Sequence, residues 1–176
     1  MMMNKKDFEA MRTELKGFED KREKTITSSR DIIKLSKLII YSMHRNEVAD
    51  AEVSVKEIRK KIKELDKTKS YDTGLSGVAF QEYVEAITYY EFLKNHRIPS
   101  YKELEVSVES YLMGLCDLTG ELVRKAVDLA INKRFSEVER IRELVEEIYG
   151  EFLRLDLRNG ELRKKSDSIK WNLRKL

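Results

Sequence analysis

The chain has 176 residues, 38% of them charged and 41% hydrophobic, with a formal net charge of +3. This length suits one domain with a substantial core, and the charge alone is too small to indicate a nucleic-acid ligand. One proline and seven glycines are too few for a turn-rich β fold, and a single cysteine excludes an internal disulfide framework and a cysteine-based zinc site. We therefore expect one helical domain over residues 1–176.

The cellular compartment can also be predicted from composition. No segment has the character of a signal peptide, and no long uncharged apolar run is present. The lone cysteine, Cys116, lies in an apolar helical pattern and suits a reducing compartment. These features predict a cytoplasmic protein that does not act at a membrane.

Hydrophobic periodicity predicts helices along the whole chain, with no sustained strand alternation and therefore no sheet. The breaks fall at a polar, glycine-containing loop over 67–77, at Pro99, and at two shorter polar stretches near 132–135 and 157–161. The expected helices are about Lys5–Arg45, Val48–Asp66, Val78–Lys94, Glu103–Asn132, Ser136–Leu155 and a last one from near Gly160. This order predicts an all-α antiparallel bundle of six to seven helices. The last helix ends at Leu176 without a cap, so we expect the natural chain to continue beyond it.

Two glutamates, Glu82 and Glu85, interrupt a predicted helix that is apolar almost all round. They are one turn apart and point to the same side. A carboxylate in an apolar setting is costly unless it is ion-paired, hydrogen-bonded or bound to a cation. A metal ion between them and salt bridges to a neighbouring helix both remain open on these grounds.

A second acidic pair, Asp117 and Glu121, is spaced i, i+4 in the fourth predicted helix. It could simply belong to a solvated face, with Arg124 neutralising Glu121 one turn away. Together, however, the two pairs could form an all-oxygen cage for a hard cation, for which magnesium is the first choice and manganese an alternative. A di-iron centre is disfavoured because neither His44 nor His96 belongs to a Glu-x-x-His motif.

Two further features concern close helix packing and RNA. Gly114 and Gly120 cost stability inside the fourth helix and could let another backbone approach closely, although Gly120 could equally be a tolerated imperfection. A basic stripe is predicted on one face of the first helix.

In this stripe, basic residues stand beside a tyrosine and a histidine, which suits contact with RNA phosphates and stacking on bases. A solvated helix face explains the same pattern equally well. The stripe consists of Arg30, Lys34, Lys37, Tyr41 and His44.

The segments LSGVAFQEYVEAITYYEFL and YLMGLCDLTGELVRKAVD resemble the translin and translin-associated factor X (TRAX) family. SSRDIIKLSKLIIYSMHR near the N-terminus and LRKKSDSIKWNLRKL near the C-terminus extend the resemblance over nearly the whole chain. The chain is more similar to the factor X side, and its compact length resembles the archaeal members.

In that family the acidic residues of these two motifs form the catalytic group of a magnesium-dependent endoribonuclease. The resemblance also implies assembly into an octameric shell that holds RNA inside, here as a homo-octamer. It therefore implies catalytic and metal-binding roles for Glu82, Glu85, Asp117 and Glu121.

The predicted function is a magnesium-dependent endoribonuclease that hydrolyses single-stranded RNA with a metal-activated water. RNA contacts are expected from the basic stripe and from Arg124, with single-stranded DNA as an additional ligand. The alternative is a non-catalytic translin-like protein that binds single-stranded RNA or DNA. A purely structural helical assembly is a third hypothesis, but it leaves the buried acidic residues unexplained.

Overall fold

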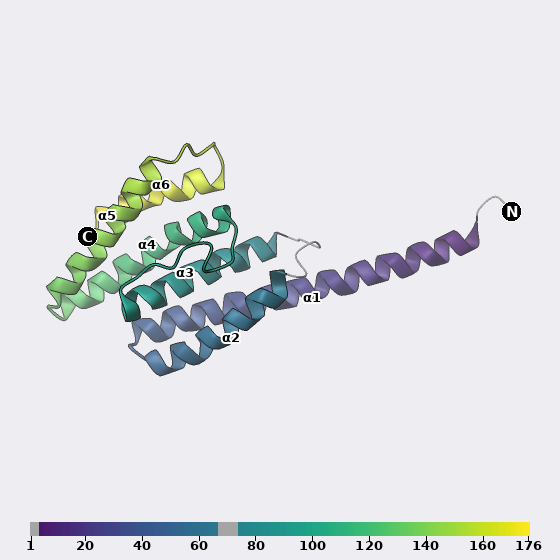
Figure 1. Ribbon diagram of the computed structural model, residues 1–176, viewed down its shortest axis with the longest axis horizontal. Helices are drawn as coiled ribbons and strands as arrows, with labels where there is room; N and C mark the ends of the chain where they lie inside the picture. Colours follow the sequence, from purple (N-terminus) through teal and green to yellow (C-terminus); the bar gives the residue numbers. More distant parts are fainter. Residues whose placement is uncertain (1–3, 67–73) are drawn as a thin grey trace.

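The computed structural model describes residues 4–66 and 74–176, and this part of the chain forms six α-helices without a strand (Figure 1). This confirms the predicted all-α bundle. The helices α1 and α2 lie on one side of the molecule, α3 and α4 in the middle, and α5 and α6 on the other side (Figure 1). The bounds are α1 Lys5–His44, α2 Val48–Asp66, α3 Leu75–Asn95, α4 Val108–Ile131, α5 Phe135–Leu153 and α6 Glu161–Leu173.

The helix bounds agree with the predicted ones to within two residues, except that α3 begins at Leu75, within the predicted loop, and that α4 begins later than predicted. That helix begins at Val108 because the Ser107 side chain accepts a hydrogen bond from the Ser110 amide at 3.1 Å, which is an N-cap contact. Glu105 has φ 55°, a left-handed conformation that interrupts helical geometry just before the cap. The predicted loop over 67–77 lies mostly outside the described residues. No helix in the described ranges has the length and apolarity needed to cross a membrane.

The helix α3 lies at the centre of the core. Its residues Tyr83, Val84, Ile87 and Tyr89 are at most 3% exposed, although they lie on different sides of the helix. Buried aliphatic side chains of α1, α2 and α4 pack around them in one continuous cluster. The prediction that this helix is apolar almost all round is therefore confirmed, and its two glutamates stand in a mostly buried element.

Gly114 allows α3 and α4 to approach closely. A Cβ atom at this position would lie 2.6 Å from the Val84 Cβ and 2.8 Å from the Gln81 carbonyl oxygen. Both distances are shorter than real contacts, so no larger residue fits without a shift of one helix. At Gly120 the nearest atom is the Asn172 Nδ2 at 3.8 Å, an ordinary contact. The close approach predicted from the two glycines therefore belongs to Gly114 alone.

Substituting Gly114 with alanine should destabilise the protein. The added methyl group must push against a backbone carbonyl as well as against Val84, and overpacking of this kind costs about 1–3 kcal/mol, of which the better helix propensity of alanine recovers at most about 1 kcal/mol. Urea unfolding measures the difference. Gly120→Ala is the matched control and should be neutral or stabilising. Equal stability of the two variants would contradict this account of the packing.

Candidate functional site

The predicted acidic residues meet where α1, α3 and α4 come together. Glu82 and Glu85 of α3 and Glu121 of α4 line a cleft of about 330 Å³. Its remaining walls come from α1 and from one basic residue of α4: Lys37, Ile40, Tyr41 and Arg124. Asp117 does not line this cleft, but it is close enough to raise the pKa of both glutamates. The structure thus gathers all four predicted carboxylates in one neighbourhood.

Glu82 and Glu85 have no neutralising partner among the described residues. Both side chains are partly buried, and within residues 4–66 and 74–176 neither makes a hydrogen bond or an ion pair within 4.0 Å. Burial, with the negative charges of Asp117, Glu82 and Glu121, raises the pKa of Glu85 to about 8. Burial also raises the pKa of Glu82, although Lys37 opposes the shift. The sequence left open that salt bridges stabilise Glu82 and Glu85 in their apolar surroundings. The structure shows no such salt bridge among the described residues.

Asp117 and Glu121, in contrast, are both partnered. Asp117 Oδ2 accepts hydrogen bonds from Gln81 Nε2 at 2.7 Å and from Lys165 Nζ of α6. Glu121 Oε2 lies 2.5 Å from His44 Nε2 and 3.6 Å from the Arg124 guanidinium. The hydrogen bond from His44 lowers the pKa of Glu121. Their side chains are 28% and 25% exposed, so this pair is not a freely solvated helix face.

The donor set matches a hard cation in chemistry but not yet in arrangement. Nowhere in the described chain do three His, Cys, Asp or Glu side chains stand together in a geometry ready for a metal ion. Yet Glu82 and Glu85 offer carboxylate oxygens without competing donors. Their pKa values are raised by burial first and by the neighbouring carboxylates second, and a divalent cation would offset both effects. Oxygen ligands of this kind fit magnesium or manganese. Asp117 and Glu121 would have to exchange their present partners to join the ligand set.

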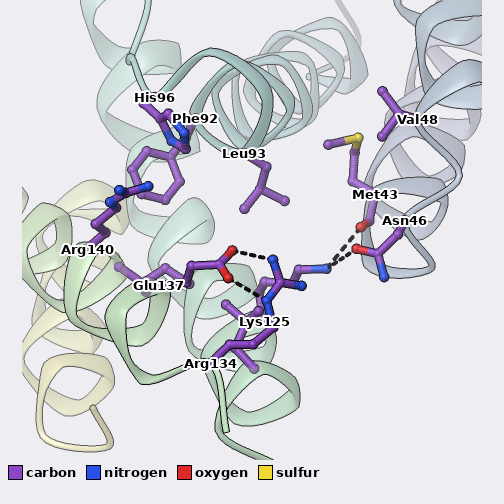
Figure 2. Close-up of a pocket in the computed structure, with 12 residues that line it drawn as sticks. Met43, Asn46, Val48, Phe92, Leu93, His96, Lys125, Arg134, Glu137 and Arg140 are labelled. Carbon is purple, nitrogen blue, oxygen red and sulfur yellow. Dashed lines mark hydrogen bonds and ion pairs between the residues drawn. The ribbon is translucent and has the colours of Figure 1, made fainter. Parts of the chain in front are cut away.

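His44 owes its position to Lys125, which lies one helical turn after Glu121 on α4. The buried ammonium of Lys125 donates to the carbonyl oxygens of Met43 and His44 at 3.3 and 3.4 Å and to Asn46 Oδ1 at 3.0 Å, as Figure 2 shows for Met43 and Asn46. These carbonyls end α1 and carry the negative end of its dipole. The contact therefore fixes the end of α1 against α4, and it sets the imidazole against Glu121.

The sequence predicted that His44 belongs to the exposed basic stripe, and this prediction is wrong. Its side chain is only 5% exposed, and the Tyr89 hydroxyl lies 3.2 Å from its Nδ1. A buried imidazole between Glu121 and Tyr89 is not available to stack on a base. His44 is thus a partner of the acidic cluster, and the other four residues of the stripe remain candidates for RNA contact.

The exposed part of the stripe forms a shallow groove of about 430 Å³ on α1. Arg30, Lys34 and Lys37 line it together with Ile33, Leu38 and Tyr41. Lys37 and Tyr41 also line the acidic cleft. The basic groove therefore leads directly into the carboxylates, an arrangement that a stripe on one isolated helix could not reveal.

Two residues of the site were not predicted from the sequence. Gln81 precedes Glu82 in the same short motif, so its position was a signal that could have been used. Lys165 is far from the acidic motifs in the chain and reaches Asp117 only because α6 packs against α4. No local pattern marks it among the many lysines of the sequence.

The protein is in class an α-helical bundle in which carboxylates from two closely packed helices lie beside a basic groove. The Translin family model matches residues 20–176, and the chain belongs to the Translin family. It is 32% identical over 152 residues to an uncharacterized protein of Methanocaldococcus jannaschii, a match covering 83% of this chain and 68% of that protein. It is 33% identical over 137 residues to the Translin-associated protein X homolog of Schizosaccharomyces pombe, covering 67% of this chain and 59% of that protein.

Solved structures show the same fold. The crystal structure of apo-NeC3PO superposes with a TM-score of 0.91 at 29% sequence identity, covering 99% of this chain and 94% of that one. The structure of a complex of AfC3PO with duplex RNA superposes with a TM-score of 0.84 at 26% identity, covering 96% of this chain and 91% of that one. These similarities confirm the resemblance to the translin and factor X family.

Proposed function

We propose that the protein is a magnesium-dependent endoribonuclease that hydrolyses single-stranded RNA inside a homo-octameric shell. The observation that carries the proposal is the continuity between the basic groove and the acidic cleft through Lys37 and Tyr41. Basic side chains attract the phosphate backbone, whereas unpaired carboxylates repel it. A groove that leads RNA toward carboxylates makes sense where a cation binds between them. The relative AfC3PO, whose structure contains duplex RNA, supports RNA as the ligand.

The residues of the cleft fall into two groups, one that would bind the cation and one that would bind the RNA strand. Glu82, Glu85, Asp117 and Glu121 would hold magnesium, which when bound supplies a Lewis acid for the phosphodiester and an activated water. Lys37 of α1 and Arg124 of α4 both line the cleft, where they would contact phosphates of the bound strand. Tyr41 is 55% exposed and offers a ring for base stacking.

Histidine–carboxylate pairing supports Glu121 in this arrangement. His44 Nε2 holds one oxygen of Glu121 at 2.5 Å, which leaves the second oxygen of that carboxylate for other ligands. Glu85 holds a proton in the metal-free protein near neutral pH because its pKa is about 8. Cation binding favours the ionised form and releases this proton.

An exposed apolar stripe on α1 supports the assembly part of the proposal. The N-terminal half of α1 extends away from the other helices (Figure 1). Four large apolar side chains stay exposed there at helical spacing, and a second copy of the chain would cover them. These residues are Phe8, Met11, Leu15 and Phe18.

A non-catalytic RNA- or single-stranded DNA-binding protein is the second candidate function. It is favoured by the pairing of Asp117 with Lys165 and of Glu121 with His44. These contacts neutralise half of the acidic cluster without any metal. In this case the cluster would be a structural feature beneath an RNA-binding surface.

Incubation of the purified protein with end-labelled single-stranded RNA separates the two functions. We expect internal cleavage with magnesium or manganese and none in chelator, and duplex RNA and single-stranded DNA of the same sequence define the substrate. RNA binding without cleavage in any divalent cation would favour the binding protein. Cleavage that persists in chelator would contradict the metal-dependent mechanism.

The contribution of the basic groove is tested by replacing Arg30, Lys34 and Lys37 together with glutamine. Single-stranded RNA binding should weaken, and the slope of log affinity against log salt should fall by about 2, since each lost phosphate contact removes about 0.7. Filter binding at several salt concentrations measures both. The matched control replaces three lysines that line neither groove, Lys56, Lys60 and Lys63 of α2. If the slope of log affinity against log salt is the same in both triple variants, the stripe is an ordinary solvated surface and does not contact RNA.

A further inference from the structure

Lys165 lies at the acidic cluster although it belongs to the last helix of the chain. Its ammonium donates to Asp117 Oδ2, the same oxygen that accepts from Gln81 Nε2 at 2.7 Å. The side chains of Lys165 and Asp117 are 30% and 28% exposed, so the pair is shielded on most sides. Lys165 is thus the cation that the structure itself places on one of the four carboxylates.

The position of Lys165 is set by the packing of α6 on α4. Ile169, one turn further along α6, is completely buried, and Asn172 Nδ2 donates to Thr119 Oγ1 of α4 at 2.9 Å. Residues 165, 169 and 172 fall on one face of the helix, which is the face turned toward α4. The lysine is therefore held at Asp117 by its helix and is not a surface side chain that meets an acid by chance.

The charge of Lys165 also acts beyond its direct partner. It lowers the pKa values of Glu82 and Glu85, whereas Asp117 raises both. Lys165 therefore offsets part of the repulsion among the carboxylates, which is the effect that a bound divalent cation would have. A single ammonium cannot satisfy four carboxylates, and Glu82 and Glu85 keep no hydrogen-bond donor among the described residues.

We propose that Lys165 is a tethered cation that occupies Asp117 in the metal-free protein and is displaced when a divalent cation binds. It is a positioning residue of the site, and it sets the affinity for metal because the metal must compete with it for Asp117. This inference rests on the proposed function, since it requires a metal site at Glu82, Glu85, Asp117 and Glu121.

The first test is metal affinity, measured by calorimetric titration of the full chain with manganese in the absence of RNA. Lys165→Met removes the charge and keeps most of the aliphatic stem, so the packing of α6 through Ile169 is retained. We expect this variant to bind manganese about 2- to 5-fold more tightly than the wild type, the range set by the strength of a partly exposed ion pair. Lys164→Met is the matched control, since it removes the same charge from an exposed neighbouring position.

Equal manganese affinities of Lys165→Met and Lys164→Met would overturn the proposal, because general electrostatics would then explain any gain. Weaker binding by Lys165→Met would also overturn it, since Lys165 would then support the metal-bound geometry. Lys165→Arg keeps a cation at Asp117 and should restore an affinity close to that of the wild type.

The second test follows the displaced amine directly. Acylation of lysines by a water-soluble reagent, followed by peptide mass spectrometry, reports the reactivity of Lys165 with and without manganese. We expect its acylation rate to increase several-fold with metal, while the exposed Lys164 and Lys170 stay unchanged as internal references. An unchanged rate at Lys165 in the metal-bound protein would contradict displacement.

The outcomes separate this inference from the proposed function. If the wild type binds manganese and cleaves RNA but Lys165 responds in neither test, the inference alone fails. If neither the wild type nor Lys165→Met binds manganese, the metal site fails and the inference fails with it. Binding by Lys165→Met but not by the wild type would support competition in its strongest form.

Discussion

Replacing Glu85 with glutamine should lower RNA cleavage by about two to three orders of magnitude while leaving assembly and RNA binding intact. The reason is that Glu85 lines the acidic cleft, where the loss of one carboxylate would weaken the binding of the proposed cation, which is worth several kcal/mol of transition-state stabilisation. Cleavage rates under saturating RNA, together with RNA affinity and light scattering, measure the three properties.

The matched control for this substitution is Glu91→Gln on the same helix. Glu91 is a buried carboxylate of α3, but it is ion-paired with Arg59 Nη2 at 2.9 Å and with Arg97 at 3.6 Å. Its loss leaves these partners unpaired and should cost about 1–3 kcal/mol of stability without affecting the chemical step. Stability loss in Glu85→Gln of the size seen in Glu91→Gln would show that Glu85 is a structural residue and would contradict its catalytic role.

The stability of the metal-free protein should fall as pH rises from about 4.5 to about 8. Burial and the neighbouring carboxylates raise the pKa of Glu85 from 4.5 to about 8, so in this window the folded protein keeps a proton that the unfolded chain has released. The free energy of unfolding decreases with pH wherever the folded state binds more protons. The penalty is absent below the lower value and complete above the higher one. Each unit of pKa is worth about 1.4 kcal/mol, so the total fall is on the order of 3–5 kcal/mol.

Urea unfolding in chelator at several pH values measures this fall. The raised pKa of Glu82 acts in the same direction. The lowered pKa of Glu121 adds stability that is constant above its ordinary value of 4.5 and is lost only as the pH falls below that value, so it does not contribute to the decline. Glu85→Gln should flatten the decline and be more stable than the wild type at pH 8. Magnesium should restore the stability of the wild type at that pH. A decline of equal size in the wild type and in Glu85→Gln would assign it to other groups.

Much of the fold could be predicted from the sequence because helix periodicity and punctuation are local signals. The start of α4 was predicted too early, since the N-cap contact of Ser107 with the Ser110 amide and the left-handed Glu105 override the propensity of the preceding residues. The four acidic residues could be recognised because carboxylates in apolar helices are costly. The sequence could not show that these four residues lie close together, because that depends on the close packing of α3 against α4 at Gly114.

The environment of the carboxylates could not be predicted, because it comes from helices distant in the chain. His44 shares its stripe with exposed lysines, but the end of α1 turns it inward, where Lys125 fixes the backbone. The reach of Lys165 to Asp117 depends on how α6 packs, which no pattern within α6 determines. Long-range packing therefore decides which carboxylates are free and which are paired.

The attachment of α1 to α4 fixes the distance between the basic groove and the acidic cleft. Lys125 and Glu121 fasten the end of α1 to the helix that carries half of the carboxylates, so the basic groove and the cleft keep a constant separation. At about 1.5 Å per residue, Arg30 stands about 10 Å from Lys37 along the axis, which is close to three nucleotides of a stacked strand at about 3.4 Å each. In the proposed endoribonuclease, the bond that is cleaved would therefore lie at a fixed number of nucleotides from the phosphate bound at Arg30.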